Sequence, residues 1–259
     1  MAMLELKELL EVNYCRFNHP SFIPCDPISI PHQFTRKEDI EISGLLTALI
    51  SWGNRASILK SAGRLMTLMS DTPFEFIRQA SPHDLLHLHG YVHRTFQYED
   101  ADFLVRALQH IYLNKGGLEE LFSSMNVFGA RHAIQQFRIA ALEVDHFPRS
   151  RKHLADPVTG SAAKRINMFL RWMVRSDNHG VDFGIWKSIS PANLICPLDV
   201  HSGRVARRLG LLERKANDWK AAEELTASLR KLDPDDPVRY DFALFGMGVS
   251  GDKGDVGMR

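Results

Sequence analysis

The chain has 259 residues, enough for one or two compact domains with a sizeable hydrophobic core. Hydrophobic residues make up 44% and charged residues 24% of it, a composition typical of globular proteins and not of disordered ones. The net charge of +1 excludes a uniformly basic or acidic chain. The three scattered cysteines, Cys15, Cys25 and Cys196, exclude a disulfide framework and a four-cysteine iron–sulfur site.

Membrane and export signals are not found in the sequence. The longest apolar stretch, residues 42–52, is interrupted by four small or polar residues and is too short to cross a bilayer. Residues 1–17 have an amphipathic helical pattern with acidic residues, which differs from the basic start of a signal peptide. We therefore expect a cytoplasmic protein that has no membrane partner.

Helical patterns dominate the chain after a proline-containing segment. Residues 18–35 hold four prolines and predict an extended connection. Apolar residues at helical spacing then predict helices at 38–51, 56–69, 103–113, 118–125, 131–144, 161–174, 200–209, 218–232 and 237–245. The predicted fold class is all-α, with two helical lobes: residues 36–148 form one, and residues 1–35 with 149–259 the other. We expect the last helix to pack against helix 200–209, and residues 251–259 to be a mobile tail.

A lysine stands at the start of one predicted helix. Gly160 and Ser161 predict the helix start, with Ser161 as the N-cap and Lys164 at the third helical position. The helix dipole disfavours a cation there, and Arg165 adds a like charge, so both favour the neutral amine. A neutral amine can attack a sugar or carbonyl carbon. The alternative interpretation is a solvated surface lysine.

An aspartate occupies the equivalent place before helix 200–209. Asp199 is placed as the N-cap, where its carboxylate accepts the backbone N–H groups two and three residues later. These bonds favour the ionised form, which can stabilise a developing sugar cation or relay a proton. The alternative interpretation is an ordinary capping aspartate.

Positive charge is concentrated around these two positions. Residues 149–215 hold thirteen lysines and arginines against five acids, an excess of eight positive charges in a chain of net charge +1. Such asymmetry is typical of a surface that binds a polyanion. A basic solvated face with no ligand is the alternative.

Two segments resemble a known superfamily. The sequence PLDVHSGRVARRLG, residues 197–210, resembles the aspartate-bearing segment of the helix-hairpin-helix DNA glycosylases. The sequence GSAAKR, residues 160–165, resembles the end of their hairpin, where a glycine-rich turn leads into the lysine-bearing helix. The DVH sequence and the 35-residue lysine–aspartate separation are most similar to the archaeal 8-oxoguanine glycosylase branch, and the arrangement also resembles an uncharacterised bacterial family. The resemblance is clear over residues 155–248 and weaker over 40–70.

The chain departs from the superfamily pattern in two ways. Ala162 stands where the hairpin usually has a second glycine, and residues 148–161 are longer and more basic than usual.

The resemblance implies a fold and an activity. It implies two helical lobes whose helix-hairpin-helix motif, near residues 149–175, flanks a cleft. It also implies a monomeric base-excision repair glycosylase with AP-lyase activity, acting on double-stranded DNA with an oxidised purine such as 8-oxoguanine and needing no cofactor or metal. Lys164 would attack C1′ of the damaged nucleoside and form a Schiff base, and Asp199 would assist base departure. The residues expected to contact DNA beside them are Gly160, Ser161, Arg165, His201 and Arg204.

The turn at residues 51–55 is a candidate for filling the gap that an extruded nucleotide leaves. Extrusion costs a few kcal/mol, so a side chain must occupy the space and hold the partner base. Asn54 and Arg55 can hydrogen-bond that base, and Trp52 can stack on it. The alternative is a helix–helix turn in which Trp52 belongs to the core.

Aromatic residues near the lysine helix are candidates for a base pocket. Trp172, Phe183 and Trp186 can grip a flipped base, and Asp182 can read a donor on a purine edge. The alternative is a loop that a core tryptophan anchors.

Other functions remain open at this stage. His83, His87 and His89 have a spacing that weakly suggests zinc, but surface or capping roles are favoured and no metal is expected. A non-catalytic helix-hairpin-helix DNA-binding protein is the main alternative to the enzyme, and a helical adaptor with a basic face is another.

Overall fold

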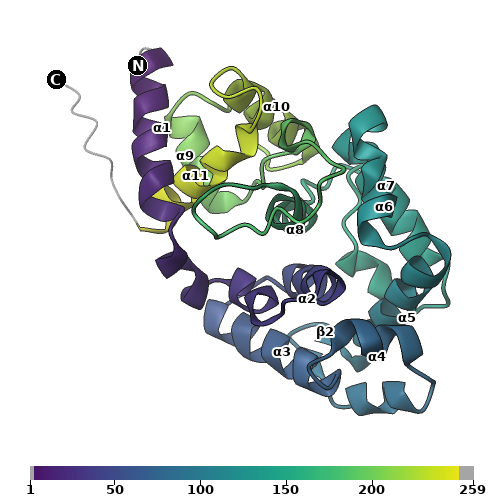
Figure 1. Ribbon diagram of the computed structural model, residues 1–259. Helices are drawn as coiled ribbons and strands as arrows, with labels where there is room; N and C mark the ends of the chain where they lie inside the picture. Colours follow the sequence, from purple (N-terminus) through teal and green to yellow (C-terminus); the bar gives the residue numbers. More distant parts are fainter. Residues whose placement is uncertain (1–2, 251–259) are drawn as a thin grey trace. The chain divides into compact units, whose positions relative to one another are not determined.

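The computed structural model describes residues 3–250 and is mainly helical (Figure 1), which confirms the predicted all-α class. The expected tail, residues 251–259, lies outside the described residues. The chain divides into two compact units: unit 1 comprises Met1–Phe22 and Pro157–Arg259, and unit 2 comprises Ile23–Asp156. No helix between residues 3 and 250 combines the length and apolar character needed to cross a bilayer.

Unit 2 contains one almost completely buried helix. Residues 40–49 of α2 are all buried, and α2 contacts η2, η3, α3 and α4. A two-stranded antiparallel hairpin, β1 with β2, precedes α5. The elements after residue 26 are η2 Pro27–Ser29, η3 Pro31–Gln33, α2 Lys37–Leu49, α3 Arg55–Leu68, α4 Pro73–Gln79, η4 Asp84–Leu88, β1 Val92–His93, β2 Phe96–Gln97, α5 Tyr98–Asn114, α6 Leu118–Ser123, α7 Met125–Leu142 and η5 Pro148–His153.

The extended connection predicted for residues 18–35 is wrong, because this segment forms three short 3₁₀ helices, η1 (Pro20–Cys25), η2 and η3. Each of the three begins with a proline, whose fixed backbone angle suits the first helical position. Asp26 caps η2 by accepting the backbone N–H of Ile28 at 3.2 Å. The prolines therefore start helical turns here instead of preventing them.

A buried aspartate ties the start of α5 to η5. Asp100 is fully buried; Oδ1 accepts the hydroxyl of Ser150 at 2.6 Å, and Oδ2 accepts the backbone N–H of Gln97 at 2.9 Å. Arg149 Nη1 and His153 Nε2 lie 3.1 and 3.3 Å from Oδ2. Burial alone would raise the pKa of Asp100, but these contacts lower it to about 2. The carboxylate therefore holds η5, near the end of unit 2, against the N-terminus of α5.

Unit 1 packs its C-terminal helix against two others. Helix α11 contacts both α1 and α9 (Figure 1). A Cβ atom on Gly246 would lie 2.2 Å from the ring of Phe17, and one on Gly248 would lie 3.0 Å from His201, so small residues permit this approach. The predicted packing of the last helix on the Asp199 helix is confirmed. The elements of unit 1 are α1 Met3–Phe17, α8 Lys164–Val174, η6 Pro191–Asn193, α9 Val200–Arg208, α10 Trp219–Arg230, η7 Pro237–Tyr240 and α11 Asp241–Val249.

The start of α8 differs from the prediction. Ala163 occupies the N-cap with a left-handed φ of 48°, and Lys164 is the first helical residue, so Ser161 is not the cap. Instead the Ser161 hydroxyl accepts the backbone N–H of Ala163 at 3.2 Å. The reason is nonlocal: Gly160 accepts the N–H of Trp219 at 3.0 Å, and Ser161 pairs with Asp218 as in an antiparallel bridge. These strand-like bonds delay the helix until residue 164.

We predict that Asp100→Asn lowers the free energy of unfolding by about 3 kcal/mol, because Arg149 and His153 lose a buried charged partner. Urea denaturation followed by circular dichroism measures this loss. The control is Asp102→Asn, which removes a partly exposed partner of Arg106 and should have a much smaller effect. Equal effects of the two substitutions would contradict the role of Asp100.

Candidate functional site

Lys164 and Asp199 meet within unit 1 although 35 residues separate them. Lys164 Nζ lies 3.7 Å from Asp199 Oδ2. The lysine side chain is 29% exposed and the aspartate side chain 23%, so both are partly accessible to solvent. The first residue of α8 and the N-cap of α9 therefore supply one amine and one carboxylate to a common site.

The two carboxylate oxygens of Asp199 have different partners. Oδ1 accepts the backbone N–H groups of His201 and Ser202 at 2.8 and 2.9 Å. The Ser202 hydroxyl in turn accepts the backbone N–H of Asp199 at 3.0 Å, which completes a capping box. The predicted N-cap role of Asp199 is confirmed. Because capping uses Oδ1 and fixes the carboxyl plane, Oδ2 remains directed at Lys164.

Two further groups interact with the lysine. Nζ lies 3.7 Å from the thioether sulfur of Met168, one helical turn along α8. Asp241, at the start of α11, interacts electrostatically with Lys164, Asp199 and Arg171. Burial raises the pKa of Asp241 to about 6, although the positive charges of Arg171 and Lys164 oppose this shift. Asp241 thus adds a second carboxyl group to the surroundings of Lys164.

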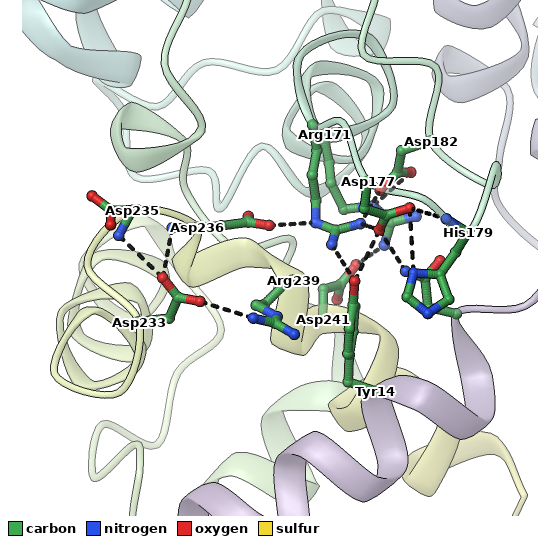
Figure 2. Close-up of polar contacts among 12 residues, drawn as sticks. Tyr14, Arg171, Asp177, His179, Asp182, Asp233, Asp235, Asp236, Arg239 and Asp241 are labelled. Carbon is green, nitrogen blue, oxygen red and sulfur yellow. Dashed lines mark hydrogen bonds and ion pairs between the residues drawn. The ribbon is translucent and has the colours of Figure 1, made fainter.

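Below Lys164, α8 carries two buried arginines held by carboxylates from other segments (Figure 2). Arg171 forms ion pairs with Asp241 and with Asp182, whose Oδ1 lies 3.3 Å from Nε. Arg175 forms ion pairs with Asp182 at 3.1 Å, Asp177 at 2.6 Å and Asp236 at 2.8 Å. We name these six residues the α8 ion network.

Tyr14 connects the α8 ion network to α1. Its hydroxyl accepts a hydrogen bond from Arg175 Nη2 at 2.7 Å and donates one to Asp177 Oδ2 at 2.9 Å. Asn18 Nδ2 donates to the same oxygen at 2.6 Å. Burial alone would raise the pKa of Asp177, but Arg175 and these hydrogen bonds hold it well below its usual range. The network thus joins α1, α8, α11 and the loop after α8.

The α8 ion network corrects the predicted basic surface. Arg171 and Arg175 count toward the excess positive charge of residues 149–215, yet they are 5% and 1% exposed and fully paired with acids. Charge counting cannot detect this, because it ignores burial. Their positions seven and eleven residues after Lys164, on the same face of a strongly amphipathic helix, are the one sequence signal that points to a role inside the unit.

Other predicted DNA-contacting residues lie near the pair in unit 1. Ser161, His201 and Arg204 are exposed, and Gly160 and Arg165 are half-buried. The backbone N–H of His201 serves the Asp199 cap, whereas its side chain extends from the exposed side of α9.

The predicted base-pocket residues lie largely in the core. Trp172 and Trp186 are fully buried, and Asp182 is held by both arginines of the α8 ion network. Phe183 is half-buried, and its backbone N–H donates to the carbonyl of Trp172 at 2.8 Å. The structure therefore places these residues as anchors of the loop after α8, which was the alternative interpretation. Neither tryptophan side chain exposes a surface that a base could contact.

The turn at residues 51–55 belongs to unit 2 and is engaged within it. Trp52 is half-buried, and its ring stacks on His153 with centroids 5.7 Å apart. Asn54 caps α3 by accepting the N–H of Ser57 at 3.3 Å, and Arg55 Nη2 lies 3.8 Å from Asp26 Oδ2. The polar groups of this turn thus have structural partners in unit 2.

The histidines near η4 do not assemble a metal site. The rings of His83 and His87 lie 6.5 Å apart, centroid to centroid. Within residues 3–250 no group of three or more His, Cys, Asp or Glu is arranged to hold a metal ion.

Comparison with protein-family models gives one match, covering residues 26–250, to the family described as "Protein of unknown function (DUF2400)". The chain belongs to this family. No curated protein and no solved structure matches the chain. The match includes Lys164, Asp199 and all six residues of the α8 ion network, whereas Tyr14 of α1, which contacts the network, lies outside it.

We predict that Asp177→Asn lowers the free energy of unfolding at pH 7 by about 3 kcal/mol, because buried Arg175 loses a charged partner. The pKa of Asp177 is lower in the folded state than in the unfolded state. The stability that its charge contributes is therefore complete above the unfolded pKa, about 3.9, and is lost as the pH falls through the folded pKa.

The difference between wild type and Asp177→Asn should therefore shrink below about pH 4, as urea denaturation at several pH values would show. Asp235→Asn, an exposed aspartate in the loop before η7, serves as the control and should behave as wild type. A stability difference that is constant over the whole acid range would contradict the assignment.

Proposed function

We propose that the chain is a DNA glycosylase with AP-lyase activity that acts on double-stranded DNA containing a damaged base. The observation that carries this proposal is the 3.7 Å approach of Lys164 Nζ to Asp199 Oδ2 at a surface that a ligand can reach. An amine and a carboxylate together suit an attack on a sugar carbon that develops positive charge. The resemblance of residues 160–165 and 197–210 to helix-hairpin-helix glycosylases names the same two residues.

In the proposed reaction, Asp199 accepts a proton from the Lys164 ammonium, which leaves a neutral amine. Nζ then forms a bond to C1′, and the bond from C1′ to the base breaks, with its electron pair leaving on the base. The base takes up the proton that Asp199 had accepted, so the Asp199 carboxylate is ionised again and stabilises the positive charge that develops on the sugar. Opening of the sugar ring gives the Schiff base, from which loss of the C2′ proton and the 3′ phosphate nicks the strand.

The surroundings of the pair support this role. The capping bonds on Oδ1 hold the Asp199 carboxylate in one orientation, as preorganised electrostatic stabilisation requires. His201 and Arg204 are exposed on α9, the helix that Asp199 caps, and can contact phosphates. The preference for an oxidised purine such as 8-oxoguanine rests on the resemblance of the DVH sequence alone. In keeping with this activity, we propose a cytoplasmic monomer that needs no cofactor.

A non-catalytic DNA-binding protein is the alternative that the same ion pair permits, since a paired lysine and a capping aspartate also stabilise structure. This alternative predicts strongly salt-dependent binding to undamaged duplex and no covalent chemistry.

We predict that borohydride traps wild-type protein on duplex DNA that carries an abasic site or 8-oxoguanine, because reduction makes the Schiff base permanent. Lys164→Gln should abolish the adduct. Asp199→Asn should lower the single-turnover rate of base removal by about 10²-fold, the order expected for a general acid–base or electrostatic group. Denaturing gel electrophoresis measures both.

Lys187→Gln is the matched control, because Lys187 is an exposed lysine of the same unit. It should form the adduct at the wild-type rate. Absence of an adduct with every substrate, together with salt-dependent binding to undamaged DNA, would replace the enzyme by the non-catalytic alternative.

A further inference from the structure

One segment contacts the chain beside both members of the lysine–aspartate pair. Residues 214–219, which we name the connecting clamp, comprise the exposed residues 214–217, the half-buried Asp218 and the buried Trp219 that begins α10. On the lysine side, Trp219 N–H donates to the carbonyl of Gly160 at 3.0 Å, and Asp218 pairs with Ser161. These bonds fix the backbone just before α8 and determine that the helix begins at Lys164.

On the aspartate side, the contact comes from Asn217. Its Nδ2 donates to the backbone carbonyl of Asp199 at 3.1 Å. The approach is close, because a Cβ atom on Gly203 would lie 2.9 Å from Asn217 Oδ1. Glycine at residue 203, on the first turn of α9, therefore leaves room for the amide beside the Asp199 cap.

The orientation of Asn217 is itself fixed by an arginine of α9. Arg207 Nη2 donates to Asn217 Oδ1 at 2.7 Å and to the carbonyl of Ala216 at 3.3 Å. Arg207 Nε donates to the carbonyl of Arg214 at 2.8 Å. The amide thus has one defined direction: its oxygen is held by Arg207 and its nitrogen is directed at Asp199.

We propose that Asn217 is a positioning residue that sets the distance between the Asp199 carboxylate and the Lys164 amine. It acts through the backbone of Asp199 and touches neither reacting atom. The catalytic meaning of this arrangement rests on the proposed glycosylase function, whereas the positioning itself does not.

The hydrogen bonds of Asn217 contribute too little to the stability of the fold to explain this arrangement. Asn217 is exposed, and a hydrogen bond between exposed groups contributes about 1 kcal/mol or less to folding. By contrast, the interaction between two charges near 4 Å changes steeply with distance when they are partly shielded from water. A small movement of the Asp199 cap would therefore alter the charge environment of Lys164 more than it alters the stability of the fold.

The charged groups around Lys164 determine the expected change. Asp199 faces it from α9 and Asp241 acts on it from α11, while Arg165 and Arg171 lie on α8 itself. A neighbouring carboxylate favours the protonated amine. If Asp199 moves away, this stabilisation weakens, and Lys164 should react faster with an aldehyde at a given pH.

The test is reductive methylation of the folded protein with formaldehyde and a borane reductant, at low conversion and a series of pH values. Peptide mass spectrometry follows each lysine separately. In Asn217→Leu, Lys164 should be labelled about threefold faster than in the wild type at a fixed pH, and in Asp199→Asn, the upper reference, about tenfold faster. Arg207→Met, which releases the amide, should change the labelling rate in the same direction.

Matched controls come from the same unit. Asn178→Leu changes an exposed asparagine of the loop after α8, and Arg208→Met changes the exposed arginine next to Arg207. Both should keep the wild-type profile, as should Lys187 in every sample. Circular dichroism and thermal unfolding would establish that each variant is folded.

A Lys164 profile that is unchanged in folded Asn217→Leu and Arg207→Met would overturn the positioning role. The measurement uses no DNA, so it is separate from the proposed activity. If the wild-type protein forms no adduct with DNA, the proposed glycosylase function is wrong. A changed labelling rate in Asn217→Leu would still support the positioning role of Asn217.

Discussion

Two buried guanidinium groups on α8 are the constraint on which unit 1 depends. Arg171 and Arg175 are almost completely removed from water, and an unpaired charge in such a place would cost several kcal/mol. The fold therefore brings carboxylates to them from the loop after α8, from the residues before η7 and from the start of α11, with Tyr14 of α1 completing the shell (Figure 2). This convergence fixes the axis and rotation of α8, and with them the place of Lys164 at its first turn.

A second, separate set of contacts places Asp199. Its carboxylate is oriented by the first turn of α9, and its backbone is held by Asn217 of the connecting clamp. Because α11 packs against α9 and also carries Asp241, which pairs with Arg171, the two sets of contacts meet through α11. These contacts around the 3.7 Å separation of amine and carboxylate involve neither Lys164 Nζ nor Asp199 Oδ2.

Local sequence patterns correctly predicted the main helices and the N-cap role of one of the two site residues, Asp199. Helical periodicity predicted the main helices and the all-α class, and the preference of aspartate for N-caps predicted the role of Asp199 correctly. The short 3₁₀ helices within residues 18–35 were missed for a local reason, because prolines can start helical turns. The other failures concern distant partners. Ser161 is not a cap because Asp218 pairs with it across the fold. Trp172 and Asp182 were candidates for a base pocket, and Arg171 for a DNA-binding face, because residue type and charge do not reveal burial.

The central claim is that Lys164, among all amines of the chain, becomes bonded to the sugar of a damaged nucleotide. Peptide mapping by mass spectrometry of the borohydride-reduced protein–DNA adduct tests it most directly. The account predicts a single modified peptide in which the sugar remnant is attached to Lys164 Nζ. Attachment to another lysine, or to the α-amino group at the start of the chain, would contradict it.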